Sequence, residues 1–337
     1  LDWVLPSGVV SVLQAGAGKI VAMPLPEPCA IQLPVKPAGI LPAARSFTRT
    51  LDRDWWVHSF SRLSDGQHPL VLASVDEEPS DQGSDSSPAL VAGPRGSRFG
   101  VAVHAALEVV DFAAWSMPLE SVCEVQRKLV ERALKSEGFG ADAAYKSALH
   151  MISATLRTPL LDDGCLADVP LTQRRAEMSF HFGMAGADAQ ALLALLHQHG
   201  YQRQRQHFAK IGTRLAGLMT GIIDLVFVHQ QRWWIVDYKT NYLGDFASDY
   251  APAMLPAAMA AHDYDLQYLI YSVALHRWLR QVRGSAYDYE RDFGGIRYLF
   301  LRGMGIGPAD NGIFACRPPQ QLIEELDRLL RAPGVAA

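Results

Sequence analysis

Cysteine is scarce in this sequence. The four cysteines among its 337 residues are Cys29, Cys123, Cys165 and Cys316, and no two of them form a CxxC pair. A zinc ribbon or an iron–sulfur cluster requires closely spaced thiolates, so the spacing supports neither kind of site. We interpret the cysteines as free thiols in a reducing cytoplasm.

Long apolar runs are also missing. No stretch approaches the roughly 20 consecutive apolar residues of a membrane-spanning helix, and no charged segment leads into an apolar run at the start, as in a secretory signal. The sequence therefore predicts a soluble, cytoplasmic protein that does not contact the membrane. Its first residue is Leu1 rather than Met, which indicates a piece of a longer protein.

An excess of positive charge, which is typical of nucleic-acid-binding surfaces, is absent: the formal net charge is −4. Residues 76–88, DEEPSDQGSDSSP, contain five acidic groups and no basic ones, so the rest of the chain carries −4 + 5 = +1. We expect this acidic segment to be a mobile loop. The rest can still form a basic channel, for which Arg203, Arg205, Lys210 and Arg214 are the candidates; an ordinary solvated face is the alternative.

A nucleotide-binding signature is lacking as well. The segment AGAGKI at residues 15–20 resembles a phosphate loop, but that motif needs Gly at the position of Leu13 and Ser or Thr at the position of Ile20. We therefore predict no ATP hydrolysis by this chain. Residues 1–54, rich in Pro, Gly and Ala, are interpreted as a connector left from a preceding region, and residues 55–337 as the functional domain.

Hydrophobic periodicity predicts helices and strands in mixed order. The expected helices cover residues 99–115, 119–137, 142–158, 188–199, 263–282 and 319–331, and the expected strands cover residues 177–182, 218–229, 232–239 and 295–301. Gln230 and Gln231 are a short enough link to join the second and third strands as a hairpin. The pattern predicts an α/β fold whose central mixed sheet is flanked by helices.

Two of these strands carry charged residues among apolar ones. Asp224 lies on one strand, and Asp237 and Lys239 lie on the next, two positions apart. Because side chains alternate along a strand, Asp237 and Lys239 should project to the same side. Charges in such an apolar setting are costly unless they are paired or bind a metal ion, so a structural salt bridge is one interpretation and a catalytic site is the other. In the second, Asp224 and Asp237 hold Mg²⁺, and Lys239 orients water or offsets charge in phosphodiester hydrolysis.

The spacing of Asp224 and Asp237-Tyr238-Lys239 fits the pattern of PD-(D/E)XK nucleases. Together with GIIDLVF, VDYKTNYLG, HDYDLQYLIYSVALHRWL and FGGIRYLFLRG, it resembles the nuclease domain of bacterial RecB proteins, the β subunits of exodeoxyribonuclease V, from about residue 55 to residue 330. Ile223 occupies the position of the proline in the family name. The resemblance implies a restriction-endonuclease-like core with extra helices.

The resemblance also implies further site residues. His104 and the main-chain carbonyl of Tyr238 become metal ligands, and a nitrogen ligand makes Mn²⁺ a plausible substitute for Mg²⁺. Gln267 and Tyr271, four residues apart on one helix face, resemble the QxxxY motif that borders the active site and supports it or contacts DNA. From the residues alone, Glu108 and Glu177 are additional acidic candidates; an exposed position is the alternative for Glu177.

The activity implied by the resemblance is metal-dependent hydrolysis of single-stranded DNA ends in recombinational repair of double-strand breaks. RecC- and RecD-type subunits and a strand-exchange recombinase are the implied partners. The alternative is a catalytically silent module that docks DNA or proteins. Such a module should have lost the acidic pair or the lysine, and this sequence retains Asp224, Asp237 and Lys239.

Overall fold

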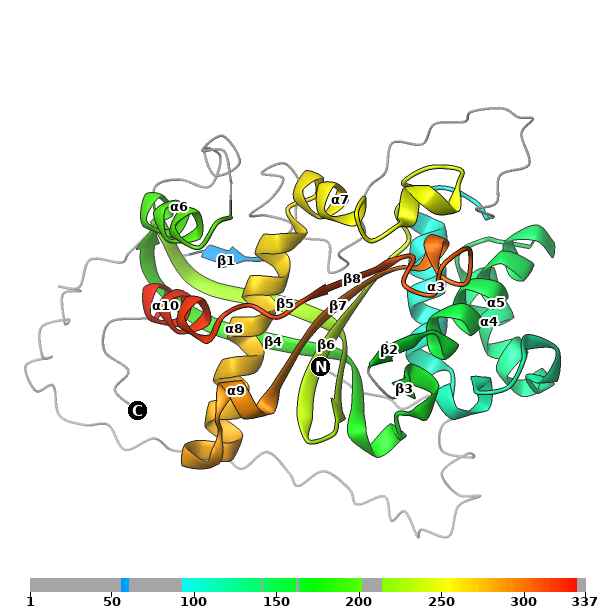
Figure 1. The fold of residues 1–337 in the computed structure, drawn as a ribbon, viewed down its shortest axis with the longest axis horizontal. Helices are drawn as coiled ribbons and strands as arrows, with labels where there is room; N and C mark the ends of the chain where they lie inside the picture. Colours follow the sequence, from blue (N-terminus) through cyan, green and yellow to red (C-terminus); the bar gives the residue numbers. More distant parts are fainter. Residues whose placement is uncertain (1–55, 61–92, 141, 162–163, 202–213, 332–337) are drawn as a thin grey trace, which may run out of the picture. The chain divides into compact units, whose positions relative to one another are not determined.

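The computed structural model describes residues 56–60, 93–140, 142–161, 164–201 and 214–331, all within the unit Asp52–Ala337 (Figure 1). The expected connector at residues 1–54, the acidic loop at 76–88, and Arg203, Arg205 and Lys210 lie outside the described residues. Among the described residues, no helix is both long and apolar enough to cross a membrane.

A mixed six-stranded sheet forms the centre of the fold. Its strands are β1 (Trp56–His58), β4 (Arg174–Asp188), β5 (Arg214–His229), β6 (Arg232–Lys239), β7 (Phe293–Phe300) and β8 (Ile313–Cys316). The long strand β5 pairs with antiparallel β4 at one edge. Its other edge pairs first with parallel β1 and then with antiparallel β6. Strand β7 lies parallel to β6, and β8 is antiparallel to β7.

The hairpin between β5 and β6 has the predicted two-residue turn. Gln230 and Gln231 both have positive φ, 48° and 62°, as a type I′ turn requires. This turn matches the right-handed twist of the strands and fixes their register, with His229 opposite Arg232. The register places Leu225 opposite Val236, which is where the regular pairing ends.

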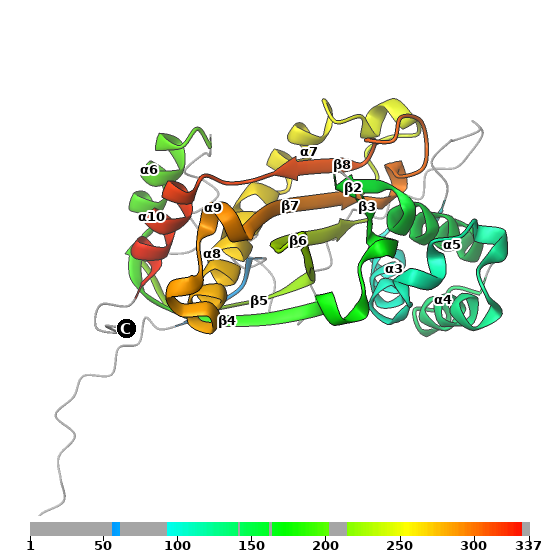
Figure 2. The same cartoon turned by 60° about the horizontal axis from the view of Figure 1, so that its bottom comes forward.

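Helices cover the sheet in two groups, and each group has its own apolar core. The longer helices are α3 (Ser97–Val109), α4 (Glu124–Ser136), α5 (Asp142–Arg157), α6 (Ala189–Gln198), α7 (Leu255–Ala261), α8 (Tyr264–Arg283) and α10 (Gln320–Leu330). Helices α3, α4 and α5 pack with Leu225, Phe227 and Val236 in one core. Helices α6, α8 and α10 pack with β4 and with residues such as Met219 in the other. Figures 1 and 2 show α8 lying across the sheet, with α6 and α10 grouped at one end and α3, α4 and α5 at the other.

Short elements connect these parts. They are β2 (Pro159–Leu161), β3 (Gly164–Cys165), α9 (Tyr289–Asp292) and the 3₁₀ turns η1 (Phe112–Trp115), η2 (Leu119–Ser121), η3 (Leu166–Asp168), η4 (Leu171–Gln173), η6 (Ala247–Tyr250), η7 (Gly284–Ala286) and η8 (Leu301–Gly303). The mixed α/β prediction with a central sheet flanked by helices is confirmed.

Two predicted helices are shorter than expected. Helix α3 ends at Val109 because the next turn makes its own local bonds: the carboxylate of Asp111 accepts a hydrogen bond from the Ala113 N–H. Helix α4 begins at Glu124 rather than at residue 119. The Arg127 side chain donates to the carbonyls of Leu119 and Val122 and stabilises the non-helical segment before it.

Candidate active site

Strands β5 and β6 separate at Asp224. Extending their register one step beyond Leu225 and Val236 sets Asp224 opposite Asp237. The main-chain N–H of Tyr238 donates instead to Oδ2 of Asp224, over 2.8 Å. A side-chain carboxylate therefore replaces a main-chain carbonyl as the acceptor at this edge. The N–H and C=O of one residue point to the same side of a strand, so the Tyr238 carbonyl also faces this edge.

Asp237 and Lys239 lie together on the face of the sheet covered by α8. Lys239 Nζ is 2.9 Å from Asp237 Oδ2, and both side chains are almost fully buried. The ammonium group also lies over the ring of Tyr264, 4.1 Å from its centre. The carboxylate and the ring hold the lysine side chain in one place and offset the cost of burying its charge.

Helix α3 brings His104 to the same edge from the other face. His104 Nδ1 is 3.5 Å from Asp224 Oδ2, and its ring meets the Tyr238 ring edge to face. One turn earlier, Gly100 packs against Thr240: a Cβ at Gly100 would lie 2.5 Å from Thr240 Oγ1. The missing side chain at Gly100 therefore allows α3 to approach the end of β6 closely enough for His104 to reach Asp224.

Glu177 is an acidic candidate whose role the sequence leaves open. Its neighbours on β4 pair with Leu225 and Ile223, which places Glu177 directly opposite Asp224. Glu177 has a φ of +50°, a left-handed conformation that is unfavourable for a residue with a side chain. Strain of this kind in the middle of a strand is typical of functional sites. No sequence pattern marks a positive φ at a glutamate, so this feature could not be predicted.

Three acidic side chains repel Glu177 electrostatically, and we call the four together the carboxylate cluster: Glu108, Glu177, Asp224 and Asp237. Partial burial raises the pKa of Glu177 to about 7, and repulsion from the other three adds to this effect. Burial also raises the pKa of Asp237, against the attraction of Lys239. Apart from that ion pair, Asp237 Oδ2 has no hydrogen-bond partner among the described residues. Four carboxyl groups thus crowd one edge of the sheet, where a bound cation would relieve the cost of ionising them.

Gln267 and Tyr271 share one face of α8, as their spacing predicts, and both are buried. The Gln267 side-chain amide donates to the Tyr271 hydroxyl (3.1 Å) and accepts from the Tyr298 hydroxyl (2.8 Å). Tyr298 is paired with Asp237 on the adjacent strand. Buried positions favour a supporting role for Gln267 and Tyr271 over contact with DNA. Sequence reasoning missed Tyr298, which reads as an ordinary aromatic residue of an apolar strand.

The donor set fits a divalent cation. Carboxylate oxygens are the preferred ligands of Mg²⁺, and one imidazole nitrogen is compatible with Mn²⁺. In the described part of the chain, no three His, Cys, Asp or Glu side chains already converge as a preformed metal site. Here Asp237 is turned to Lys239 and His104 to Asp224. The crowding of the carboxyl groups, whose pKa values burial and mutual repulsion raise, is the observation that indicates a cation.

Comparison with known proteins identifies the family. The model of the PD-(D/E)XK nuclease superfamily matches residues 87–331, which is most of the chain and includes every residue of the carboxylate cluster. The chain belongs to the PD-(D/E)XK nuclease superfamily. The predicted membership is thus confirmed.

Several similar proteins are RecBCD enzyme subunits RecB. This PD-(D/E)XK chain is 32% identical to the one of Escherichia coli (strain K12) over 301 residues, 33% identical to that of Haemophilus influenzae over 308 residues, and 32% identical to that of Mycobacterium tuberculosis H37Rv over 325 residues. The alignments cover 85%, 84% and 85% of this chain but 24%, 24% and 29% of the relatives. The chain thus spans about a quarter of the length of these relatives, and the predicted resemblance to the RecB nuclease domain is confirmed.

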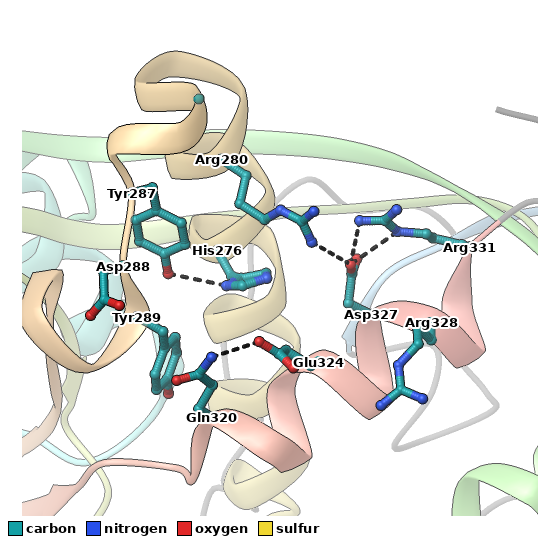
Figure 3. Close-up of a pocket in the computed structure, with 11 residues that line it drawn as sticks. His276, Arg280, Tyr287, Asp288, Tyr289, Gln320, Glu324, Asp327, Arg328 and Arg331 are labelled. Atoms are coloured by element: carbon teal, nitrogen blue, oxygen red, sulfur yellow. Dashed lines mark hydrogen bonds and ion pairs between the residues drawn. The ribbon is translucent and has the colours of Figure 1, made fainter. Parts of the chain in front are cut away.

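The PD-(D/E)XK chain also has a pocket elsewhere, between α8, the segment around α9, and α10 (Figure 3). It encloses about 570 Å³ and is lined by polar side chains, among them His276, Arg280 and Glu324. Asp327 at its border is bound by Arg331, and Figure 3 shows this pair beside His276. None of the residues of the carboxylate cluster lines this pocket, so we assign it no part in the candidate site.

Proposed function

We propose that this chain is a divalent-metal-dependent DNA nuclease that hydrolyses phosphodiester bonds. The observation that supports this most strongly is the convergence of Asp224, Asp237 and Lys239 where β5 and β6 separate. A buried lysine beside an overcrowded set of carboxylates has no evident structural benefit, since an apolar pair would stabilise the sheet at least as well. It does match the needs of phosphoryl chemistry, where a cation and an ammonium group face an anionic substrate.

The ligands for the ion are proposed to be Asp224, Asp237, His104 and the main-chain carbonyl of Tyr238, with Glu177 at the border of the site. Mg²⁺ is the expected ion, and Mn²⁺ is expected to substitute for it. Lewis acidity toward the phosphate, and a lower pKa of nearby water, are what a divalent ion supplies when bound. Asp224 also keeps the Tyr238 main chain in place through its hydrogen bond, and so fixes the direction of the carbonyl.

In the proposed reaction, water attacks the phosphorus atom, and the bond from phosphorus to the leaving sugar oxygen breaks. The products are a phosphate monoester and a free hydroxyl group. Lys239 is placed to orient the water or to offset the additional negative charge in the transition state. Asp237 and the Tyr264 ring keep the ammonium group of Lys239 in position. The hydrogen bond from Tyr298 to Gln267 ties α8 to the strand beside Asp237.

The relatives suggest the setting of this activity. Their name places RecB within the RecBCD enzyme. We infer that the chain acts as an exodeoxyribonuclease V-type nuclease on single-stranded DNA ends during recombinational repair, in the cytoplasm. RecC- and RecD-type subunits and a recombinase are the proposed partners.

The test is digestion of end-labelled single-stranded DNA by the purified chain with Mg²⁺, with Mn²⁺ and with EDTA. Cleavage that requires the ion supports the proposal. If DNA is bound but not cut with either ion, the chain is the silent docking module instead. The pattern of labelled products separates removal of nucleotides from an end from internal cuts, and so tests the exonuclease assignment separately.

A further inference from the structure

Arg302 is a buried arginine that the proposed reaction does not use. It lies on η8, directly after β7, and only 3% of the residue is exposed. Its Nε donates to the carbonyl of Thr240 (2.6 Å), its Nη1 to the carbonyl of Gly93 (3.4 Å), and its Nη2 to the carbonyl of Pro94. The guanidinium group thus bridges two chain segments that lie far apart in sequence.

Those two segments carry the two halves of the proposed site. Thr240 directly follows Lys239 at the end of β6, and Gly93 and Pro94 lead into α3, the helix of His104. The Arg302 guanidinium also lies over the ring of Phe99 in the first turn of α3, with 5.6 Å to the ring centre. Arg302 therefore contacts the entry to α3 through the carbonyls of Gly93 and Pro94 and through the ring of Phe99.

Thr240 is held against α3 from a second direction. Its carbonyl binds Arg302, and its side chain packs on Gly100. His104 is four residues after Gly100 and lies on the same helix face. A shift of the entry to α3 relative to Thr240 would consequently move His104 relative to Asp224.

We propose that Arg302 is a positioning residue: it fixes the entry of α3 to the end of β6 and thereby holds His104 beside Asp224. The expected effect of Arg302 on metal binding rests on the proposed function. The expected effect of Arg302 on the distance between His104 and Asp224 does not. Arginine suits this position because its planar fork donates in several fixed directions at once, whereas a lysine ammonium is a point charge without that fixed geometry.

The test compares Arg302→Lys with Arg277→Lys. Arg277 is a matched control because it is also a largely buried arginine with several bonds, in this case from α8 to the side chain and carbonyl of Asp327 on α10. Both variants should lower the melting temperature. Titration with Mn²⁺ below both melting temperatures should show roughly 10–100-fold weaker binding for Arg302→Lys and unchanged binding for Arg277→Lys, as expected when support of a metal ligand is lost.

A crystal structure of metal-free Arg302→Lys protein provides the second measurement. The separation of His104 Nδ1 and Asp224 Oδ2 should exceed the 3.5 Å of the unmodified chain. Unchanged separation, or Mn²⁺ binding weakened equally in both variants, would overturn the proposal. If the unmodified chain binds no Mn²⁺, the proposed function fails, and the crystallographic distance alone decides the role of Arg302.

Discussion

Replacing Glu177 by Gln should stabilise the metal-free protein at alkaline pH. The fold raises the pKa of this carboxyl group from an ordinary 4.5 to about 7. Ionising Glu177 is therefore more costly in the folded state than in the unfolded chain. The stability associated with its neutral form is fully present below about pH 4.5 and is lost as the pH rises to about 7.

The magnitude follows from that difference in pKa. At about 1.36 kcal/mol for each pH unit, the difference of about 2.5 pH units corresponds to roughly 3 kcal/mol. Glu177 is more than a third exposed, so solvent screening reduces the expected effect to about 1–2 kcal/mol. Gln keeps the size and the positive φ of the position and removes the charge.

The assay is urea unfolding with EDTA at pH 4.5 and at pH 8.5. The Glu177→Gln protein should match the unmodified chain at the lower pH and exceed its free energy of unfolding by about 1–2 kcal/mol at the higher one. Glu120→Gln, at an exposed position on η2, serves as the control and should show no such change. Equal or lower stability of Glu177→Gln at pH 8.5 would refute the idea of a crowded carboxylate cluster.

Three further predictions concern the site and its support. Gln267→Leu and Tyr298→Phe should each lower the free energy of unfolding by about 1–3 kcal/mol, because each leaves a buried polar partner without its hydrogen bond. In urea unfolding, the double variant should lose less stability than the sum of the two single losses. Gly100→Ala should weaken Mn²⁺ binding, because its methyl group would lie 2.5 Å from Thr240 Oγ1. Gly140→Ala is the control and should not weaken binding, because the space around Gly140 is open. Equal affinities of the two variants for Mn²⁺ in calorimetry would contradict this prediction. Mn²⁺ binding should strengthen as the pH rises through about 7 and release protons from the carboxylate cluster, and a pH-independent affinity measured in several buffers would argue against the raised pKa values.

Much of the central sheet could be predicted from local sequence signals. Strand β6 has the predicted bounds because its apolar run is delimited by the turn at Gln230 and Gln231 on one side and the polar segment after Lys239 on the other. Strand β1 could not be predicted, since three residues carry no periodicity. It pairs where Gly217, with a φ of 134°, leaves room for the backbone of Trp56. Such pairing depends on a partner about 160 residues away in the chain.

The candidate site likewise contains residues that local sequence signals predict and residues that they do not. The common face of Asp237 and Lys239 follows from the two-residue period of a strand, and the neighbouring hairpin strand carries Asp224. Only the resemblance to RecB proteins predicts His104 as a metal ligand, because a histidine on an apolar helix has no distinctive spacing. The strained Glu177 and the bridging Arg302 depend on contacts between distant segments, which no local pattern encodes.

The most direct test of the central claim compares Asp237→Ala with Lys239→Ala in Mn²⁺ titration and in cleavage of single-stranded DNA. We expect Asp237→Ala to abolish both tight ion binding and cleavage, because it removes a ligand. Lys239→Ala should still bind the ion but lose most of the rate, because it removes a group that acts on the transition state. Normal cleavage by both variants would contradict the assignment of this site as the catalytic centre.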